Sequence, residues 1–304
     1  MSEYHVPVML QECIEGLAIK ENGIYVDVTF GGGGHSKEIL KQLGAGGKLL
    51  AFDQDKAAKL NAEKIEQRSF TFIEANFKHL KRYLKLHGIN KVDGILADLG
   101  ISSHQIDQPE RGFSTRFDAS LDMRMDQNAS ISAKTVVNEY DEQALHKVLG
   151  IYGEIRNAKT LAAAIVSERF VKPFDTTAEL IELLDKLAPK HREYKYYAQV
   201  FQAIRIEVND EMGALEDFLM QTADVLKPGG RLVIESYHSL EDRMVKNFIK
   251  TGKLFGEVEK DFFGNQLKPF NTITRKPITA SEEELKINNR ARSAKLRIAE
   301  KLEE

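Results

Sequence analysis

The sequence predicts an α/β fold: a doubly wound, largely parallel sheet with a small α-helical domain inserted into it. The first hundred residues alternate short apolar runs with amphipathic stretches, as successive βα units do. A fifth apolar run, 231–236, starts 134 positions after Ala97 ends the fourth. One crossover with its helix needs only about 30 residues, so about a hundred residues are in excess and form the predicted insertion.

The predicted strands are short, rich in Ile, Val, Leu and Phe, and lack polar alternation, which is typical of strands covered on both faces. The first four are 23–28, 48–52, 70–73 and 92–97, and helices are expected near 36–43, 56–67 and 77–86. The fifth strand, 231–236, follows the stop signal Lys227-Pro228-Gly229-Gly230. Before that signal, one face of a helix is marked by Met212, Leu215, Leu219 and Leu226.

The excess residues carry their own helix signals. Asp141 can cap a helix that bears Leu145, Val148 and Leu149, and Thr176 with Glu179 forms a capping box. We therefore predict a sheet domain made of 1–107 and 198–304, and an inserted helical domain, 108–197. Ligands of open α/β sheets bind beyond the carboxyl ends of the strands, so an insertion after strand four is expected to stand over the site.

Composition narrows the class of protein. The 304 residues are 42% hydrophobic and 29% charged, and no segment approaches the roughly 18 uninterrupted apolar residues of a membrane span. The amino terminus has no basic stretch leading into an apolar run, and Cys13 is the single cysteine. We expect a soluble protein of the reducing cytoplasm, with no membrane partner.

A net charge of −3 gives no overall attraction to nucleic acid, so a polyanion would have to be met by local basic patches. Two stretches are candidates, and the alternative for each is an ordinary solvated face. In the first, Lys190, Arg192 and Lys195 alternate with Tyr194, Tyr196 and Tyr197. The second comprises Arg290, Arg292, Lys295 and Arg297.

A glycine-rich turn, 31–34, ends the first strand and opens the first helix, where bare backbone lets a ligand approach closely. It does not fit a dinucleotide fingerprint, because the sixth position is Ser36 or Lys37 in the two registers. Asp53 follows Gly31 by 22 positions, where an acidic side chain can accept both hydroxyls of a ribose. Together with the nearby charge of Asp27, this favours an adenosyl ligand that is positively charged.

Each of these features also has a plainer interpretation. A glycine run can be only a tight turn, and Asp53 can be a helix cap. Phe77, placed after the third strand where an adenine could lie against its ring, can be a core residue. Asp98 begins the segment that follows strand four, where amino-group methyltransferases generally place a polar residue facing the target nitrogen.

Eight motifs in order make the chain resemble the bacterial 16S ribosomal RNA small-subunit methyltransferase H family, also called MraW. They are 5–10 (HVPVML), 29–36 (TFGGGGHS), 98–103 (DLGISS), 111–114 (RGFS), 121–125 (LDMRM), 201–205 (FQAIR), 237–243 (YHSLEDR) and 290–297 (RARSAKLR). The resemblance spans nearly the whole chain. Mild departures are His104 and Asn289, where the family usually has proline, and Tyr237, where phenylalanine is usual.

The resemblance implies a Rossmann-like class I sheet that binds S-adenosylmethionine. It implies methylation of the exocyclic N4 of one cytidine, at about position 1402 of 16S rRNA, a base that must be splayed out of structured RNA to be reached. The substrate would be 16S rRNA, expected within the small ribosomal subunit. The family pattern carries cofactor contacts onto Gly33, Gly34, His35, Asp53, Phe77, Asp98 and Gln105.

The expected catalytic group is Asp98, whose carboxylate would accept a hydrogen bond from the target amine; a nearby main-chain carbonyl is the alternative. RNA recognition is expected from the inserted domain and the C-terminal basic segment. His238 and Ser239 could suggest a nucleophile with Asp242, but Ser239 and Asp242 are better explained as a helix N-terminal capping pattern.

No metal site is expected, because the histidines show no ligand spacing with acidic or thiol partners; those considered are His5, His35, His79, His87 and His104. The sequence leaves the oligomeric state open, a homodimer included. Two other functions remain: a DNA amino-methyltransferase, which would more typically carry Asp-Pro-Pro-Tyr where Leu99-Gly100 follow Asp98, and a non-catalytic RNA-binding assembly factor.

Overall fold

The computed structural model describes residues 7–303, so His5 and Val6 of the first motif lie outside the described part of the chain. The chain divides into two compact units. We call Met1–Gly100 with Met212–Glu304 the sheet unit, and Ile101–Glu211 the helical unit.

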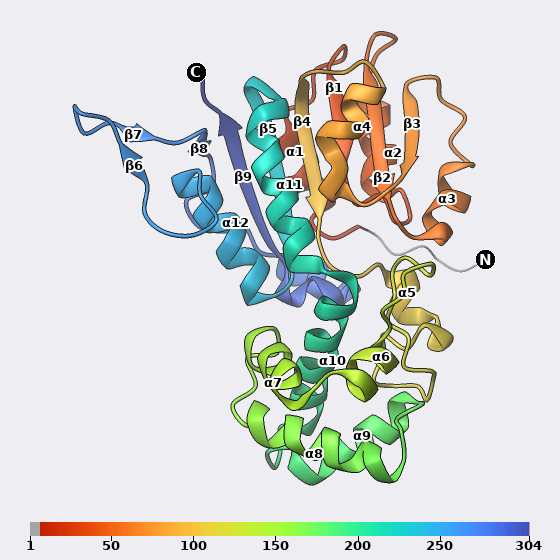
Figure 1. The fold of residues 1–304 in the computed structure, drawn as a ribbon. Coiled ribbons are helices and arrows are strands. Elements are labelled where there is room, and N and C mark those ends of the chain that lie inside the picture. The colour runs from red at the N-terminus through yellow and green to blue at the C-terminus, as the bar shows by residue number, and fades with distance from the viewer. Residues whose placement is uncertain (1–6, 304) are drawn as a thin grey trace. The chain divides into compact units, whose positions relative to one another are not determined.

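The sheet unit is built on seven strands in the order β3-β2-β1-β4-β5-β9-β8 (Figure 1). The five strands from β3 to β5 run parallel; at one edge β9 pairs antiparallel with β5, and β8 pairs antiparallel with β9. Their bounds are β1 Ile24–Asp27, β2 Lys48–Asp53, β3 Phe70–Glu74, β4 Val92–Asp98, β5 Leu226–Ser236, β8 Phe270–Thr272 and β9 Lys295–Lys301. This arrangement confirms the predicted fold class, a Rossmann-like sheet with an all-helical insertion after β4.

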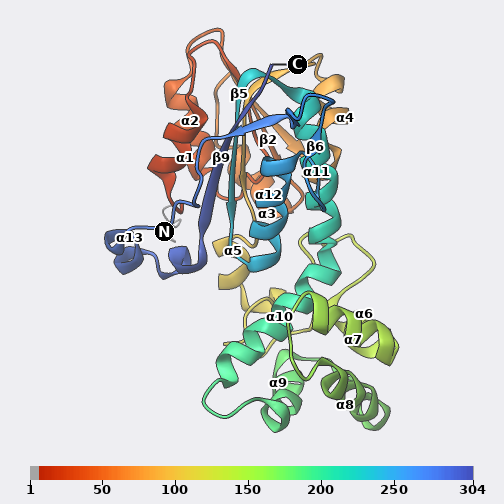
Figure 2. The same cartoon turned by 90° about the vertical axis from the view of Figure 1, so that its left-hand side faces the viewer.

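Helices cover both faces of this sheet, as Figure 2 shows: α1 and α2 lie on one face, and α4, α11 and α12 on the other. Alternate strand residues face opposite ways, so Val26 and Ile95 join one apolar core while Tyr25 and Leu96 join the other. Strands buried on both sides explain the uninterrupted apolar runs. The helices of this unit are α1 Leu10–Leu17, α2 Gly34–Gln42, α3 Lys56–Ala62, η1 Phe77–His79, α4 Leu80–Leu86, α11 Glu211–Val225, α12 Ser239–Thr251, α13 Glu282–Ile287 and η3 Asn289–Ser293.

The last strands were not predicted from the sequence. The long strand β9 pairs with β5 from Arg231↔Glu300 to Ser236↔Lys295, and β8 pairs with β9. A separate two-stranded hairpin is formed by β6 (Glu259–Lys260) and β7 (Gln266–Leu267). The signal for β9 is weak in sequence because its Lys and Arg residues alternate with Leu, Ile and Ala, a pattern that also suits a basic surface segment.

The helical unit has its own apolar core, to which its helices α6 to α10 contribute. The capping predictions in this unit are confirmed: Asp141 caps α7, and Thr176 with Glu179 forms a capping box on α9. Its helices are α5 Ser103–Asp107, η2 Pro109–Arg111, α6 Ala133–Glu139, α7 Glu142–Ile151, α8 Ala158–Val171, α9 Thr177–Leu187 and α10 Glu193–Asn209.

The unit boundaries differ from the expected 108 and 197. Position 197 falls inside α10, which continues to Asn209 and places Val200, Phe201 and Val208 in the helical core. Because one continuous helix carries these apolar residues, the helical unit extends to Glu211.

Two element bounds predicted in the sheet unit are also wrong. The strand β5 begins at Leu226, which places Leu226 and the Lys227-Pro228-Gly229-Gly230 segment in the strand, with a register shift opposite Val92 and Gly94. The helix expected over 56–67 ends at Ala62. Within residues 7–303, no helix combines the length and apolar composition that a membrane crossing requires.

Candidate active site

The candidate site lies at the carboxyl ends of β2, β1 and β4, which are neighbours in the sheet. Three segments meet there: Asp53 closes β2, the glycine turn follows β1, and Asp98 closes β4. Parallel strands present their carboxyl ends at one edge, and the chain leaves each of them by a loop. The sequence-predicted residues Gly33, Gly34, His35, Asp53 and Asp98 are thus brought to one edge of the sheet.

The geometry of the turn requires glycine at two positions. Gly33 has φ 76°, and a Cβ there would lie 2.7 Å from the Phe30 ring. A Cβ on Gly34 would lie 2.2 Å from Cγ of Pro7. The turn is therefore a packed structure and not merely a flexible one, and it leads directly into α2 at Gly34.

Asp53 ties the end of β2 to the glycine turn. Its Oδ2 accepts the backbone N–H of Gly31 at 2.8 Å, and its Oδ1 accepts that of Asp55 at 2.9 Å. Burial raises the pKa of Asp53 to about 6, although these two hydrogen bonds oppose the shift. The helix-cap alternative for Asp53 is wrong, because Asp55 caps α3 through Ala57 N–H. A carboxylate has about four acceptor lone pairs, so Asp53 can still accept ligand hydroxyls.

Asp98 is fixed from three sides. Its backbone N–H donates to Thr29 Oγ1 at 2.7 Å, Tyr237 Oη donates to its Oδ1 at 2.8 Å, and His35 Nδ1 lies 3.9 Å from its Oδ2. Burial raises the pKa of the Asp98 carboxyl, while charge on His35 and the Tyr237 hydrogen bond lower it. His35 Nε2 lies 3.3 Å from the Val8 carbonyl, which can only accept, so Nε2 carries a proton.

Asp27, expected to add charge beside the ligand, is instead buried inside the turn. Its Oδ2 accepts the Ser36 hydroxyl at 2.7 Å and its Oδ1 accepts the Thr29 N–H at 3.1 Å. Burial raises the pKa of the Asp27 carboxyl. Its contacts join β1 to the first turn of α2.

Two further predicted residues are placed differently. Phe77 follows β3 in η1, half-buried, with its ring 5.4 Å from that of Phe218 in an edge-on arrangement. Gln105 belongs to the helical unit, where it completes a capping box on α5 with Ser102. Gln105 is therefore not among the residues that the strand ends bring together.

Three acidic or phenolic neighbours of Asp98 were missed by the sequence reasoning. Glu235 pairs in register with Asp98 on β5, Tyr237 lies two residues further on, and Glu241 lies in the first turn of α12. Glu241 Oε2 accepts the Tyr237 N–H at 2.9 Å and the His238 N–H at 3.3 Å. A signal existed for Glu235: it is an acid inside the apolar run 231–236, at the position that a parallel pairing sets beside Asp98.

The expected Ser239 and Asp242 capping pattern is wrong by one position. His238 is the N-cap of α12 and forms a reciprocal capping box with Glu241. Asp242 instead accepts from Arg297 at 2.7 Å and from Lys295 at 3.1 Å. These hydrogen bonds, although opposed by burial, hold the pKa of Asp242 below its usual value.

The two basic-aromatic stretches are divided by the fold. In the first, Tyr196 and Tyr197 are core residues, while Tyr194 is 85% exposed beside exposed Lys190, Arg192 and Lys195. In the second, Arg297 is buried in β9 and Lys295 is half-buried, and both contact Asp242. Arg292 is exposed and Arg290 half-buried, so residues 290–297 do not form one continuous basic face.

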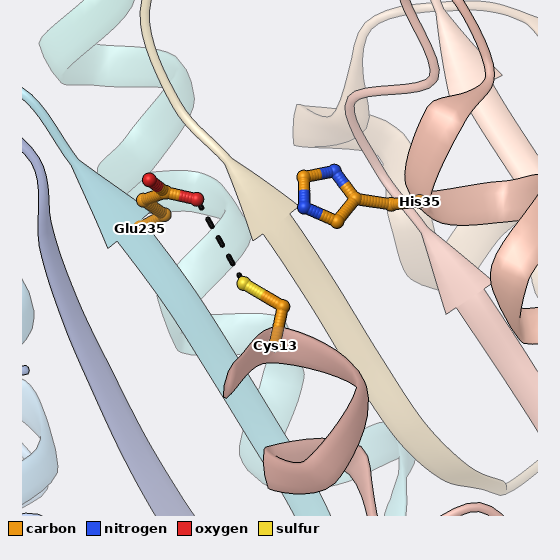
Figure 3. Close-up of side chains that lie close together, drawn as sticks. All are labelled: Cys13, His35 and Glu235. Carbon is orange, nitrogen blue, oxygen red and sulfur yellow. Dashed lines mark hydrogen bonds between the residues drawn. The ribbon is translucent and has the colours of Figure 1, made fainter. Parts of the chain in front are cut away.

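Cys13, His35 and Glu235 place sulfur, nitrogen and oxygen atoms within 4.8 Å of one another (Figure 3). Such a group could surround an ion, but its thiol and its carboxyl already contact each other. The Cys13 thiol donates to Glu235 Oε2 at 3.8 Å. Burial, with the charge of Glu235, raises the pKa of the Cys13 thiol, which disfavours the thiolate that a metal needs.

Comparisons with known proteins show which family the chain resembles. The sequence profile of the MraW methylase family matches residues 2–302. A relative from Cytophaga hutchinsonii, called ribosomal RNA small subunit methyltransferase H, is 61% identical and covers 98% of this chain and 99% of that protein. Relatives with the same name from Flavobacterium johnsoniae and Bacteroides fragilis are 60% and 53% identical, over 99% and 98% of this chain and 98% and 97% of theirs.

A crystal structure of an rRNA methylase from Streptococcus thermophilus aligns over 98% of this chain and 99% of that one, with a TM-score of 0.40 and 14% identity. The family assignment does not use that structural likeness. It rests on the full-length family match and on the identities above 50%. The chain therefore belongs to the MraW methylase family, a family of S-adenosylmethionine-dependent methyltransferases.

Proposed function

We propose that this chain methylates small-subunit ribosomal RNA, at the exocyclic N4 of one cytidine in 16S rRNA. Close relatives carry the name of a ribosomal RNA small subunit methyltransferase, which supports the substrate class. The observation that carries the chemistry is the placement of two carboxylates, Asp53 and Asp98, at the ends of strands that flank the glycine turn.

The residues at this edge fit a cationic adenosyl ligand. Asp53 offers acceptor lone pairs for the hydroxyls of a ribose, and Phe77 offers a half-buried ring after the next strand for an adenine. Asp98 supplies negative charge that suits an ammonium or a sulfonium group. When bound, S-adenosylmethionine supplies the electrophilic methyl group; Gly33, Gly34 and His35 complete the proposed binding set.

The target nitrogen is a poor nucleophile, because its lone pair is delocalised into the cytosine ring. Holding the amine in line with the methyl group can supply around 7 to 11 kcal/mol of the barrier reduction. We assign Asp98 the role of accepting a hydrogen bond from the N4 amine, which restores nucleophilicity and receives a proton during or after transfer. If Asp98 also anchors the amino group of the cofactor, its two oxygens divide these tasks.

RNA recognition is assigned to the helical unit and to exposed basic residues. Lys190, Arg192 and Lys195 lie in the helical unit with exposed Tyr194, a combination suited to phosphates and a stacked base. In the C-terminal segment, Arg292 is the exposed candidate. A cytosine held in structured RNA must be splayed out before its amine can be methylated.

The decisive experiment supplies small ribosomal subunits lacking the mark, and separately free 16S rRNA, with labelled methyl donor. Mass spectrometry of nuclease fragments then maps the methylated atom. We expect one N4-methylcytidine per 16S rRNA. Methylation of DNA and not rRNA would establish the DNA amino-methyltransferase, and cofactor-free binding to the subunit without transfer would establish an assembly factor.

A further inference from the structure

A string of polar side chains, Asp98, Tyr237, Glu235 and Cys13, reaches from the end of β4 to the helix α1. Tyr237 Oη lies 2.8 Å from Asp98 Oδ1 and 3.1 Å from Glu235 Oε1. The other oxygen of Glu235 lies 3.8 Å from the Cys13 sulfur (Figure 3). All four residues belong to the sheet unit, and Glu235 and Cys13 have no solvent exposure.

Counting protons limits how this string can be arranged. A phenol hydroxyl has one proton, yet Tyr237 Oη is within hydrogen-bond distance of two carboxyl groups. That proton can form a hydrogen bond to only one of the two carboxyl groups. The other short contact needs a proton from the carboxyl itself, since an ionised carboxylate only accepts. One of the two acids is therefore protonated.

The surroundings decide which acid keeps its proton. The Asp98 side chain is 26% exposed and has His35 Nδ1 at 3.9 Å from its second oxygen. Glu235 is fully buried, and its second oxygen accepts from the Cys13 thiol. Burial, reinforced by the charge of Asp98, raises the pKa of Glu235 well above its usual value. A neutral Glu235 is thus the less costly arrangement.

We infer that Glu235 is held as a neutral acid whose proton fixes the Tyr237 hydroxyl, which in turn holds the Asp98 carboxylate ionised and in position for methyl transfer. Every donor then has an acceptor: Cys13 Sγ–H to Glu235 Oε2, Glu235 Oε1–H to Tyr237 Oη, and Tyr237 Oη–H to Asp98 Oδ1. Tyr237 and Glu235 are positioning residues, because they act through Asp98. The value of this arrangement for catalysis rests on the proposed function, but the protonation of Glu235 does not.

Other charged groups also act on this string. Around Asp98 they come from three elements besides β5: His35 on α2, Asp27 on β1 and Glu241 on α12. Glu284 on α13 acts on Glu235 and raises its pKa further. Because the two neighbouring acids, Asp27 and Glu241, oppose ionisation of Asp98, the charge of His35 and the hydrogen bond from Tyr237 are what favour its carboxylate.

The first test is the variant Tyr237→Phe, which removes one hydroxyl and keeps the ring. The acid limb of the kcat/KM profile should shift up by about one to two pH units, the size expected for losing one hydrogen bond to a charged acceptor. Activity should recover towards the parent value at higher pH. A uniform loss at every pH, with lowered stability, would indicate a merely structural tyrosine and overturn the positioning role.

The second test is Glu235→Gln, a neutral isostere whose amide can donate to Tyr237 and accept from Cys13. The acid limb should stay within a few tenths of a pH unit of the parent, because no charge is removed. A shift to lower pH would mean that Glu235 is ionised in the parent, and the proposal would fail.

A measurement without activity separates this inference from the proposed function. The infrared spectrum of the parent in heavy water should contain the carbonyl stretch of a buried carboxylic acid, absent in Glu235→Gln. The matched control is Glu300→Gln on β9, whose carboxylate pairs with Arg231 at 2.9 Å and should leave the band intact. If Glu235→Gln kept the band, the inference would be overturned, even if rRNA methylation were established.

The same preparations test the metal alternative. Elemental analysis of the parent should find no stoichiometric transition metal. A bound zinc lost in Cys13→Ser would make Glu235 an ionised ligand and refute its neutral state.

Discussion

We predicted functional residues both at the carboxyl ends of the strands and in the C-terminal segment 290–301. The structure gathers the first set at one edge of the sheet, but it engages part of the second set in ion pairs. Asp53 and Asp98 end the two strands on either side of the one that leads into the glycine turn, at the same edge of the sheet. In the C-terminal segment, Arg297 and Lys295 contact Asp242 from a strand of the sheet. A turn depends on neighbouring residues and can be predicted from sequence. The ion-pair partner of a basic residue can lie far away along the chain, and sequence patterns do not identify it.

The largest effect is expected at the strand-end edge, from Asp98→Asn. The neutral amide is a weaker hydrogen-bond acceptor for the N4 amine than the carboxylate and cannot take up its proton, so the methylation rate should fall about 100- to 10,000-fold. Single-turnover kinetics with calorimetric cofactor binding would measure it. The control Asp224→Asn, on the exposed end of an ion pair with Lys81, should keep the parent rate. A parent rate in Asp98→Asn would remove Asp98 as the acceptor.

The next effect concerns the C-terminal segment. Asp242→Asn leaves the buried Arg297 without its charge partner, so the free energy of unfolding should fall by about 3 kcal/mol in denaturant titrations near neutral pH. Because the pKa of Asp242 is lowered in the fold, its contribution is present above the unfolded pKa and lost as pH falls through the folded value. Equal stability of parent and variant would return Arg297 to the candidate RNA-binding residues.

Asp53 gives a smaller, pH-dependent effect on cofactor binding. Its pKa of about 6 means that protonation competes with binding below that pH. Asp53→Asn should weaken cofactor affinity at least about tenfold at pH 7.5, as expected for lost hydrogen bonds to a charged acceptor. Isothermal titration calorimetry from pH 5 to 8 should show the parent losing affinity at the acid end and the variant changing little.

The raised pKa of Asp53 also makes the stability of the fold depend on pH. Because the folded-state pKa of Asp53 is raised, the parent loses stability as pH rises from about 4 to about 6, and Asp53→Asn should lack this loss. Identical pH–stability curves would show that the carboxyl is not perturbed.

The smallest effect compares two arginines of the C-terminal segment. Arg292→Gln should weaken RNA binding a few-fold and lower the slope of log affinity against log salt by about 1, without a change in stability. Arg297→Gln should lower stability and leave the salt slope unchanged. Filter binding at several salt concentrations, with thermal unfolding alongside, measures both; the reverse pattern would contradict the division drawn here.

Much of the sheet was accessible from sequence because its signals are short-range. Four parallel strands, the glycine turn and the caps at Asp141 and Thr176 depend on residues within a few positions of one another. The excess length between 97 and 231 likewise predicted an inserted helical unit, although α10 carries it to Glu211. Register errors arose where local signals conflict, as at His238 and Ser239.

The sequence by itself determined the fold class, the family and the carboxylates at the strand ends, because each follows from spacing along the chain. The tertiary structure alone decided that β9 joins the sheet and that Glu235, Tyr237 and Cys13 line up behind Asp98. Those contacts join residues up to 222 positions apart, and their protonation depends on burial that no local pattern encodes.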